Sequence, residues 1–172
     1  ELEWATDVLS EYFRVHNDQP AVDSMQKRFA SAVSGCDSRH PKLIPYQRDL
    51  SVSLEMDFGA LLQLAHRRRS VRWFLQKPVP RDAIDRAVEI AAQSPSACNR
   101  QPFEFRIIDD RAVVNEVIKI PFGLAGYGHN VPVVCVIVGK QRNYFDERDR
   151  HLIYIDGSLA AMSFLFGLEV QG

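Results

Sequence analysis

The chain has 172 residues, of which 46% are hydrophobic and 25% are charged, and its 21 basic and 22 acidic residues leave a formal net charge of -1. This composition is typical of a globular protein and argues against a strongly basic nucleic-acid binder and against an acidic disordered tail. We also expect no contact with a membrane, because the apolar stretches 131–138 and 159–168 are far shorter than the roughly 20 residues of a spanning helix.

Three cysteines, Cys36, Cys98 and Cys135, cannot all pair within one chain. We therefore expect no disulfide framework and, since no signal peptide opens the chain, a cytoplasmic location. Cys36 and His40 have the spacing of half a zinc site, but no second pair follows at a suitable distance, so we predict no metal site.

Residues 1–56 differ in pattern from the rest of the chain and are predicted to form a helical N-terminal extension. Apolar residues recur at helical spacing over 3–15, and again from Pro20 to a point near Gly35. Residues 35–51 show no period and are predicted to be a loop. This extension carries no motif that indicates chemistry.

Two helices are predicted after Asp57, one running from Phe58 into a block of arginines and one beginning at Pro80. The second has a regular apolar face, which we expect to be buried: Ile84, Ala87, Val88 and Ala91. A strand is predicted next, over Phe103–Ile108, because apolar and charged residues alternate there.

The remaining elements are predicted to be a helix over Asp110–Ile120, a flexible glycine loop over 123–128 and a buried strand over Val133–Val138. The last is a helix over Asp156–Val170, with Asp156 or Ser158 as its cap. Helices are mixed with few strands, which favours an α+β fold over a regular βαβ array.

The first candidate binding segment follows the helix that begins at Phe58. From Arg67 to Arg81 there are six basic residues and no acidic one. Guanidinium groups give forked, charge-assisted hydrogen bonds and Ser70 adds a hydroxyl, so this segment suits a phosphate group. The alternative is a solvated basic face at a helix end.

The second candidate is residues 94–102, in which two prolines bracket short polar side chains. Such a loop is rigid and offers hydroxyl and amide groups at fixed positions, although a plain connection between helix and strand has the same pattern. Cys98 has no charged activator nearby and is not proposed as a nucleophile. The glycines of residues 123–128 do not have the order of a dinucleotide fingerprint.

Taken in order, Arg68–Phe74, Pro78–Pro80 and Pro95–Pro102 resemble the N-terminal signature of the nitroreductase family. Val131–Val138 is similar to the central strand of that family, and Tyr154–Leu168 is similar to its long core helix. The resemblance covers residues 58–172, and the ordered set of motifs is far more specific than any one of them.

The resemblance implies an α+β fold with a mixed sheet flanked by helices, and an FMN-dependent oxidoreductase. Such an enzyme takes hydride from NADH or NADPH and passes it to a small organic acceptor, such as a nitroaromatic compound or a quinone. It also implies a homodimer with flavin sites shared at the interface. The chain would then consist of the helical extension 1–56 and an FMN-binding domain 57–172.

The resemblance further implies two groups of cofactor-binding residues. In the first group, Arg68, Ser70 and Arg72 bind the FMN phosphate and ribityl chain, and Arg69 lies along the pyrimidine edge of the ring. The second approaches the flavin from the partner subunit: Pro95, Ser96 and Asn99, with Gln101 supporting the loop. Arg67 is out of register with the motif and is expected to point to solvent. No catalytic acid or base is predicted, because the flavin carries the chemistry.

The chain ends at Gly172, where the family continues with a further turn, a strand and late basic residues, so we expect it to be a fragment. Two alternatives stay open. One is a branch of the family with different flavin chemistry, such as reductive dehalogenation. The other is a non-catalytic flavin-binding protein of the same fold.

Overall fold

The computed structural model describes residues 2–33 and 42–172, and the chain divides into two compact units, Glu1–Leu54 and Glu55–Gly172. Cys36 and His40, the half of a zinc site noted in the sequence, lie outside the described residues. Within the described residues, no group of three His, Cys, Asp or Glu side chains could hold a metal ion.

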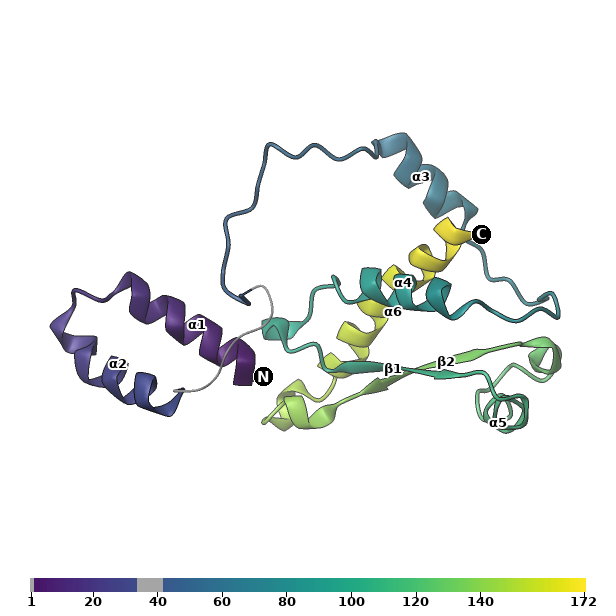
Figure 1. Cartoon of the computed structure of the whole chain (residues 1–172). Helices are drawn as coiled ribbons and strands as arrows, with labels where there is room; N and C mark the ends of the chain where they lie inside the picture. The colour runs from purple at the N-terminus through teal and green to yellow at the C-terminus, as the bar shows by residue number, and fades with distance from the viewer. Residues whose placement is uncertain (1, 34–41) are drawn as a thin grey trace. The chain divides into compact units, whose positions relative to one another are not determined.

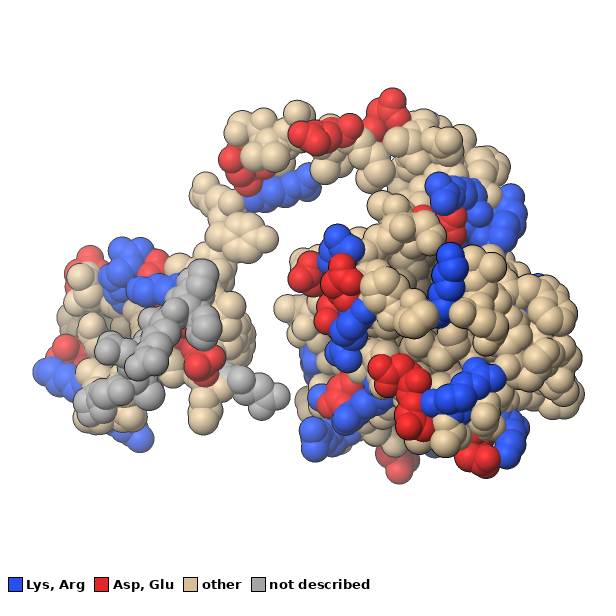
Figure 2. Space-filling view, turned by 45° about the vertical axis from the view of Figure 1, so that its right-hand side comes forward, with Lys and Arg blue, Asp and Glu red and all other residues tan. Residues whose placement is uncertain are grey.

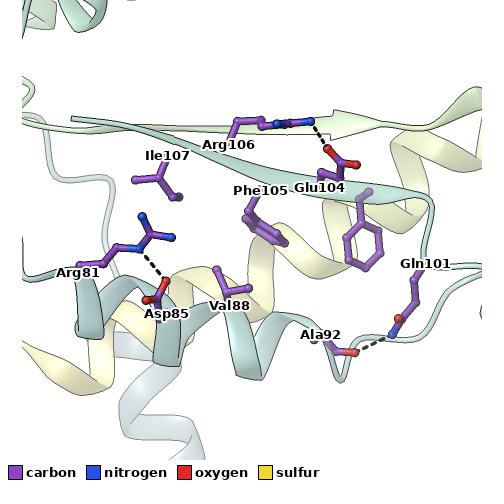
Figure 3. Close-up of a pocket in the computed structure, with 10 residues that line it drawn as sticks. Arg81, Asp85, Val88, Ala92, Gln101, Glu104, Phe105, Arg106 and Ile107 are labelled. Atoms are coloured by element: carbon purple, nitrogen blue, oxygen red, sulfur yellow. Dashed lines mark hydrogen bonds and ion pairs between the residues drawn. The ribbon is translucent and has the colours of Figure 1, made fainter. Parts of the chain in front are cut away.

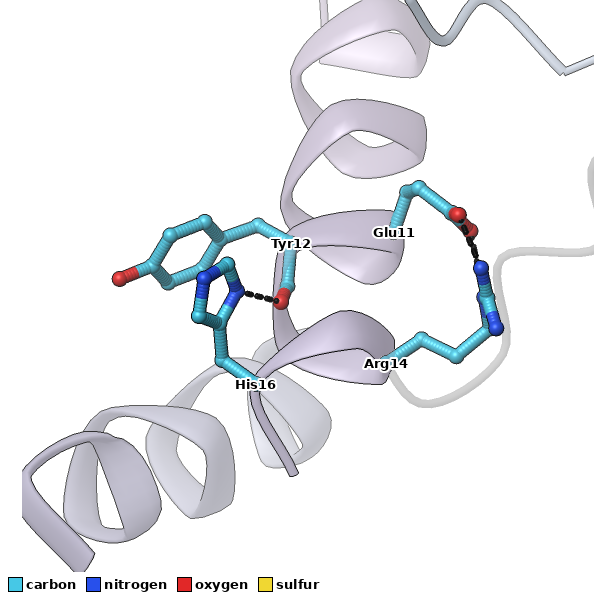
Figure 4. A network of polar contacts seen from close by, with 4 residues as sticks. All are labelled: Glu11, Tyr12, Arg14 and His16. Atoms are coloured by element: carbon cyan, nitrogen blue, oxygen red, sulfur yellow. Dashed lines mark hydrogen bonds and ion pairs between the residues drawn. The ribbon is translucent and has the colours of Figure 1, made fainter. Parts of the chain in front are cut away.

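The first unit contains two helices, α1 (Leu2–Val15) and α2 (Pro20–Ala32). Phe13 of α1 is 7% exposed and packs on Phe29 of α2, with ring centroids 5.3 Å apart. At the end of α1, Arg14 pairs with Glu11, and the His16 ring donates to the Tyr12 carbonyl (Figure 4). The buried Asp7 carboxylate accepts from the Leu43 amide at 2.9 Å, which attaches the following segment to α1.

In the second unit, the helices α4 (Arg81–Ala91) and α6 (Leu152–Gln171) pack on one side of a small sheet (Figure 1). Its helices and strands, in chain order, are α3 (Phe58–Arg67), α4 (Arg81–Ala91), β1 (Phe103–Ile108), α5 (Arg111–Val117), β2 (Val134–Gly139) and α6 (Leu152–Gln171). Short 3-10 turns η1 (Ala97–Asn99), η2 (Gly128–Asn130), η3 (Gln141–Asn143) and η4 (Glu147–Asp149) lie between them. The predicted α+β fold is confirmed.

The strands β1 and β2 form an antiparallel pair, with Phe103 opposite Gly139 and Ile108 opposite Val134. A two-stranded sheet is marginal by itself and needs helices packed on a face. Helices α4 and α6 supply that packing, because alternate side chains of β1 contact the core that these helices form. Phe105, for example, lies on Phe164 with ring centroids 5.2 Å apart.

Helix α4 buries the face that its sequence predicts. Ile84, Ala87 and Ala91 are at most 5% exposed, and Val88 packs at the margin of the same cluster. Helix α6 adds Ala160 and Phe164 to that cluster. The two helices cross so closely that an added Cβ at Gly167 would lie 2.9 Å from the Ala87 Cα. A glycine is therefore required at this crossing.

Two predicted features of the second unit are wrong in detail. Neither Asp156 nor Ser158 caps α6, which begins at Leu152 with His151 as a cap that makes no side-chain bond. Asp156 instead lies inside the helix and binds groups outside it. The strand β2 is half-buried rather than buried, since Val138 is 40% exposed, because helices cover only one face of the sheet.

The apolar stretch 159–168 also underestimates the length of its helix. The segment 147–171 is long and apolar enough to cross a membrane by length and composition alone. The core helix of a globular protein meets the same criterion. Here one side of α6 is buried against the rest of the unit, through Gly157, Ala160, Phe164 and Gly167.

We predict that Gly167→Ala lowers the free energy of unfolding relative to Gly157→Ala by about 1–3 kcal/mol. Both changes replace a helical glycine with alanine, and this replacement alone stabilises a helix by roughly 1 kcal/mol. An added Cβ at Gly157 would meet only the Ile137 side chain, at 3.6 Å, whereas at Gly167 it would meet helix backbone. Denaturant titration measures both variants, and equal stabilities would show that α4 and α6 separate without cost.

Candidate functional site

The first group of predicted site residues lies in the arginine segment, residues 68–72, which begins where α3 ends. The Arg68 amide closes the last turn of α3 on the Leu64 carbonyl at 3.0 Å, and the Arg68 ψ of 123° then turns the chain into an extended path. Residues 68–80 form neither helix nor strand, and nearly all of them are exposed. The segment thus presents its side chains without a regular element of its own.

The charges of this basic stretch fall into two classes. At its two ends, Arg67 pairs with Glu169 of α6 and Arg81 pairs with Asp85, each at 2.8 Å. The Arg67 side chain is 64% exposed, in keeping with the prediction that it points to solvent, and the Glu169 carboxylate of α6 lies within its reach. Between them, Arg68, Arg69 and Arg72 make no ion pair with any described residue.

The unpaired arginines use only part of their hydrogen-bonding capacity. Arg69 donates to the Arg68 carbonyl at 2.9 Å, and Arg72 donates to the Ser70 carbonyl at 3.2 Å. The Arg68 Nε is buried and, within the described chain, has no hydrogen-bond partner. A buried donor without a partner is unfavourable, so this nitrogen marks a place where an external acceptor would be stabilising.

The second group lies in the polar loop, residues 94–102, which includes η1. Cys98, Asn99 and Gln101 all have positive φ angles, of 53°, 52° and 43°. For residues other than glycine this left-handed region is costly and persists only where the surroundings impose it. The Gln101 amide donates to the Ser96 hydroxyl, and its side chain donates to the Ala92 carbonyl, both at 2.8 Å. Pro95 is exposed.

The polar loop is attached to α6 by two further contacts. The Ser94 hydroxyl donates to the Ser163 hydroxyl at 2.7 Å, and the Ala97 amide donates to the Asp156 carboxylate at 3.1 Å. Asp156 is 3% exposed and also accepts from the Tyr144 hydroxyl at 2.6 Å. Burial, together with the hydrogen bond and charge of Asp156, raises the pKa of Tyr144 above its usual value.

Residues after β2 complete the support of the polar loop. The Arg100 guanidinium carbon lies 5.3 Å from the Tyr144 ring centre and 5.7 Å from that of Phe145, which are cation–π distances. Asn143 donates to the Arg100 carbonyl at 3.2 Å. Sequence reasoning missed Tyr144 and Asp156 as supports, because they are more than forty residues from the loop and belong to no local motif.

The residues of each group lie close to one another, but the two groups lie apart. The arginine segment precedes α4 and the polar loop follows it, so they lie beyond opposite ends of that helix (Figure 1). A helix of 11 residues is about 16 Å long. Within one chain, therefore, α4 separates the two groups.

Neither of two hollows in the surface of the described chain brings together the residues of either group. A groove of about 430 Å³ runs between α4 and β1, with Val88, Phe105 and Ile107 along it, and Gln101 is the one predicted site residue that lines it (Figure 3). A second hollow, of about 390 Å³, is lined in part by residues 76–79 and contains none of the arginine segment. On the visible face of this unit, basic and acidic side chains are intermixed rather than gathered into one basic surface (Figure 2).

Comparison with known proteins confirms the resemblance noted in the sequence. Residues 65–125 match the model of the Nitroreductase family. The chain is 31% identical over 83 residues to an iodotyrosine deiodinase of Danio rerio, which is 47% of this chain and 27% of that protein. It is 34% identical over 73 residues to an NADH dehydrogenase of Thermus thermophilus, which is 42% of this chain and 35% of that protein.

Solved structures show the same fold. A putative NADH dehydrogenase/NAD(P)H nitroreductase of Bacteroides thetaiotaomicron aligns with a TM-score of 0.57 and 27% identity, covering 66% of this chain and 63% of that chain. A putative nitroreductase of Desulfovibrio desulfuricans, in complex with FMN, aligns with a TM-score of 0.54 and 20% identity, covering 64% of this chain and 63% of that one. The chain thus spans less than two thirds of each of these proteins.

We predict that Tyr144→Phe lowers the free energy of unfolding at neutral pH by about 1.5–3 kcal/mol, because it removes a hydrogen bond to a buried carboxylate. The effect should shrink as the pH rises above 10, the usual pKa of tyrosine. There the unfolded chain releases a proton that folded Tyr144 retains, so the wild type loses stability that the variant never had.

The matched control is Tyr154→Phe, since Tyr154 is 73% exposed. Denaturant titration from pH 7 to pH 11 compares the two variants with the wild type. If the control loses as much stability as Tyr144→Phe, the bond to Asp156 is not what Tyr144 contributes.

Proposed function

We propose that the second unit, which has the nitroreductase fold and matches the nitroreductase family over residues 65–125, binds FMN as part of an oxidoreductase. One observation carries the proposal. The arginines without a carboxylate partner among the described residues, Arg68, Arg69 and Arg72, are those aligned with the motif, whereas the flanking Arg67 and Arg81 each pair with a carboxylate.

The donors of the arginine segment fit the phosphate of FMN. Three guanidinium groups and the exposed Ser70 hydroxyl are donors, and the buried Arg68 Nε requires an acceptor. A phosphate monoester offers several charged acceptor oxygens in a small volume, which suits charge-assisted bonds from arginine. Bound FMN would supply hydride transfer from NADH or NADPH to a small organic acceptor such as a nitroaromatic compound or quinone.

In this proposal the residues of the arginine segment bind different parts of the cofactor. Arg68, Ser70 and Arg72 hold the phosphate and ribityl chain, and Arg69 lies along the pyrimidine edge of the ring. A cation there stabilises negative charge on the ring and so favours its reduced form. The chain itself binds and orients, and no side chain is required as an acid or base.

We further propose that the polar loop reaches the flavin from a second copy of the chain. Pro95, Ser96 and Asn99 would approach the cofactor, and Gln101 would support the loop. The support is the separation of the two groups by α4, which a symmetric dimer overcomes. Helix α6 offers a surface for such a dimer, because the side opposite its core face exposes large apolar residues: Tyr154, Ile155, Leu159, Met162 and Leu165.

The similarity to iodotyrosine deiodinase favours a second candidate reaction, the reductive removal of halide from an aromatic substrate. The two candidates differ in the acceptor and share the FMN site. Halide release from a halogenated phenol, measured beside the reduction of a quinone, separates them.

We predict that the purified protein takes up FMN and releases it unchanged on denaturation, and that Arg68→Ala weakens FMN binding on the order of ten- to a hundredfold. Losing one hydrogen bond to a charged group costs about 1.5–3 kcal/mol, which corresponds to that change in dissociation constant. A flavin titration followed by fluorescence measures it.

The control is Arg67→Ala, which removes a neighbouring charge that is already paired with Glu169. We expect at most a few-fold change in FMN affinity from it. Equal weakening by the two variants would mean that the block is a general basic face. A protein that binds no FMN would contradict the proposal as a whole.

A second prediction tests the shared site. Arg69→Ala and Asn99→Ala are each expected to lose most NAD(P)H-dependent reduction of an artificial acceptor, because each damages both sites of a symmetric dimer. A mixed dimer carries one doubly damaged site and one intact site, so part of the activity should return when the variants are denatured and refolded together. A monomer by sedimentation, or no recovery in demonstrated mixed dimers, would exclude a shared site.

A further inference from the structure

A buried asparagine holds the chain immediately after Ser70. Asn130, in η2, is 7% exposed. Its Oδ1 accepts from the Phe74 amide at 2.8 Å, and its Nδ2 donates to the Arg72 carbonyl at 2.6 Å. Since an amide N–H can only donate and a carbonyl oxygen can only accept, these two partners fix the orientation of the Asn130 side chain.

The same turn also contacts the Arg72 side chain. The Arg72 guanidinium carbon lies 5.8 Å from the ring centre of Tyr127, the residue that precedes η2. The Asn130 carbonyl accepts from the Gln76 side chain at 3.1 Å. The path of residues 72–76 is therefore set by contacts with η2, since this stretch has no helix or strand of its own.

The turn η2 is itself held by α5. Arg111 donates from its two terminal nitrogens to the His129 and Val131 carbonyls, the residues on either side of Asn130. The Asn130 amide closes the turn on the Tyr127 carbonyl at 3.0 Å. A continuous series of contacts thus leads from α5 through η2 to the arginine segment.

We propose that Asn130 is a positioning residue that sets the phosphate-binding geometry of the arginine segment, and that Arg111 supports it in this role. The inference rests on the proposed FMN site. Asn130 itself does not contact the cofactor. It binds the Arg72 carbonyl and so fixes the backbone there. The backbone in turn sets the direction in which the Arg72 side chain and its neighbours point toward the phosphate.

The proposal distinguishes two flavins. Riboflavin has the ring and ribityl chain of FMN but no phosphate. A residue that acts mainly on phosphate geometry should weaken the binding of FMN much more than that of riboflavin. A residue that only stabilises the fold should weaken both flavins alike, so the ratio of the two dissociation constants is the informative quantity.

The experiment is a titration of the wild type and of Asn130→Ala with FMN and with riboflavin. We expect Asn130→Ala to weaken FMN binding about tenfold, as the loss of one well-formed charge-assisted bond would. Riboflavin binding should weaken by a clearly smaller factor, because riboflavin keeps the ribityl chain that Arg72 also contacts in the proposed site but lacks the phosphate. The matched control is Asn115→Ala, an exposed asparagine of α5, which should leave both affinities unchanged.

A second variant keeps the test decisive if Asn130→Ala does not fold. Arg111→Lys retains the charge on an exposed side chain but cannot donate to two carbonyls with a rigid fork. It should lower the preference for FMN over riboflavin in the same direction, by a few-fold. An unchanged preference in whichever of the two variants folds overturns the role of Asn130.

Failure of the proposed function has a separate signature. A wild-type protein that binds FMN and riboflavin equally well lacks a phosphate site, whatever Asn130 does. A wild type that prefers FMN, with variants that keep this preference, retains the proposed function and refutes the positioning role.

Discussion

The close crossing of α4 and α6 is the contact on which the second unit depends. Because Gly167 has no side chain, α6 approaches the backbone of α4 at Ala87, and the two helices form one rigid pair. The strands β1 and β2 then pack their alternate side chains against this pair, which provides the covered face that a two-stranded sheet requires. The arginine segment precedes α4 and the polar loop follows it. The positions of both segments therefore depend on this pair of helices.

The two segments are held in different ways. The polar loop is fastened directly to α6, through Ser163 and Asp156, and its residues Asn99 and Gln101 have a left-handed backbone. Among the described residues, the arginine segment is held by the ion pair of the preceding Arg67 with α6, by the bond of its backbone to η2 and by the Arg72 side chain over Tyr127. Its unpaired guanidinium groups are therefore available to an anion without first breaking an ion pair.

Local patterns predicted much of the fold. The alternation over Phe103–Ile108 and the apolar face of α4 were confirmed, because a periodic pattern reflects burial of one side of an element. The predicted cap at Asp156 was wrong for a physical reason. A carboxylate that would suit a helix start is also the strongest available acceptor for the buried hydroxyl of Tyr144, and this partner is not visible in the local sequence.

The candidate site could be predicted only in part. Composition alone left a basic face as an alternative to a phosphate site, and the ordered motifs favoured the latter. Pairing of Arg67 with Glu169 could not be foreseen, since the two residues are 102 positions apart and meet only through the packing of α3 on α6. The same limit hid Asn130, whose partners lie 56 and 58 positions away. Which arginines remain unpaired is a property of tertiary structure.

The bond between Asn130 and Arg72 has a consequence for the chain entropy of the unit. It closes a loop of 58 residues that contains α4, β1 and α5. Closing such a loop costs chain entropy, which contacts formed earlier within the loop reduce. Helical turns of α4 and α5 within this span shorten the effective loop and so lower the entropic cost of the bond. The contact that η2 makes with the arginine segment is therefore a long-range one, and its stability depends on the elements folded between residues 72 and 130.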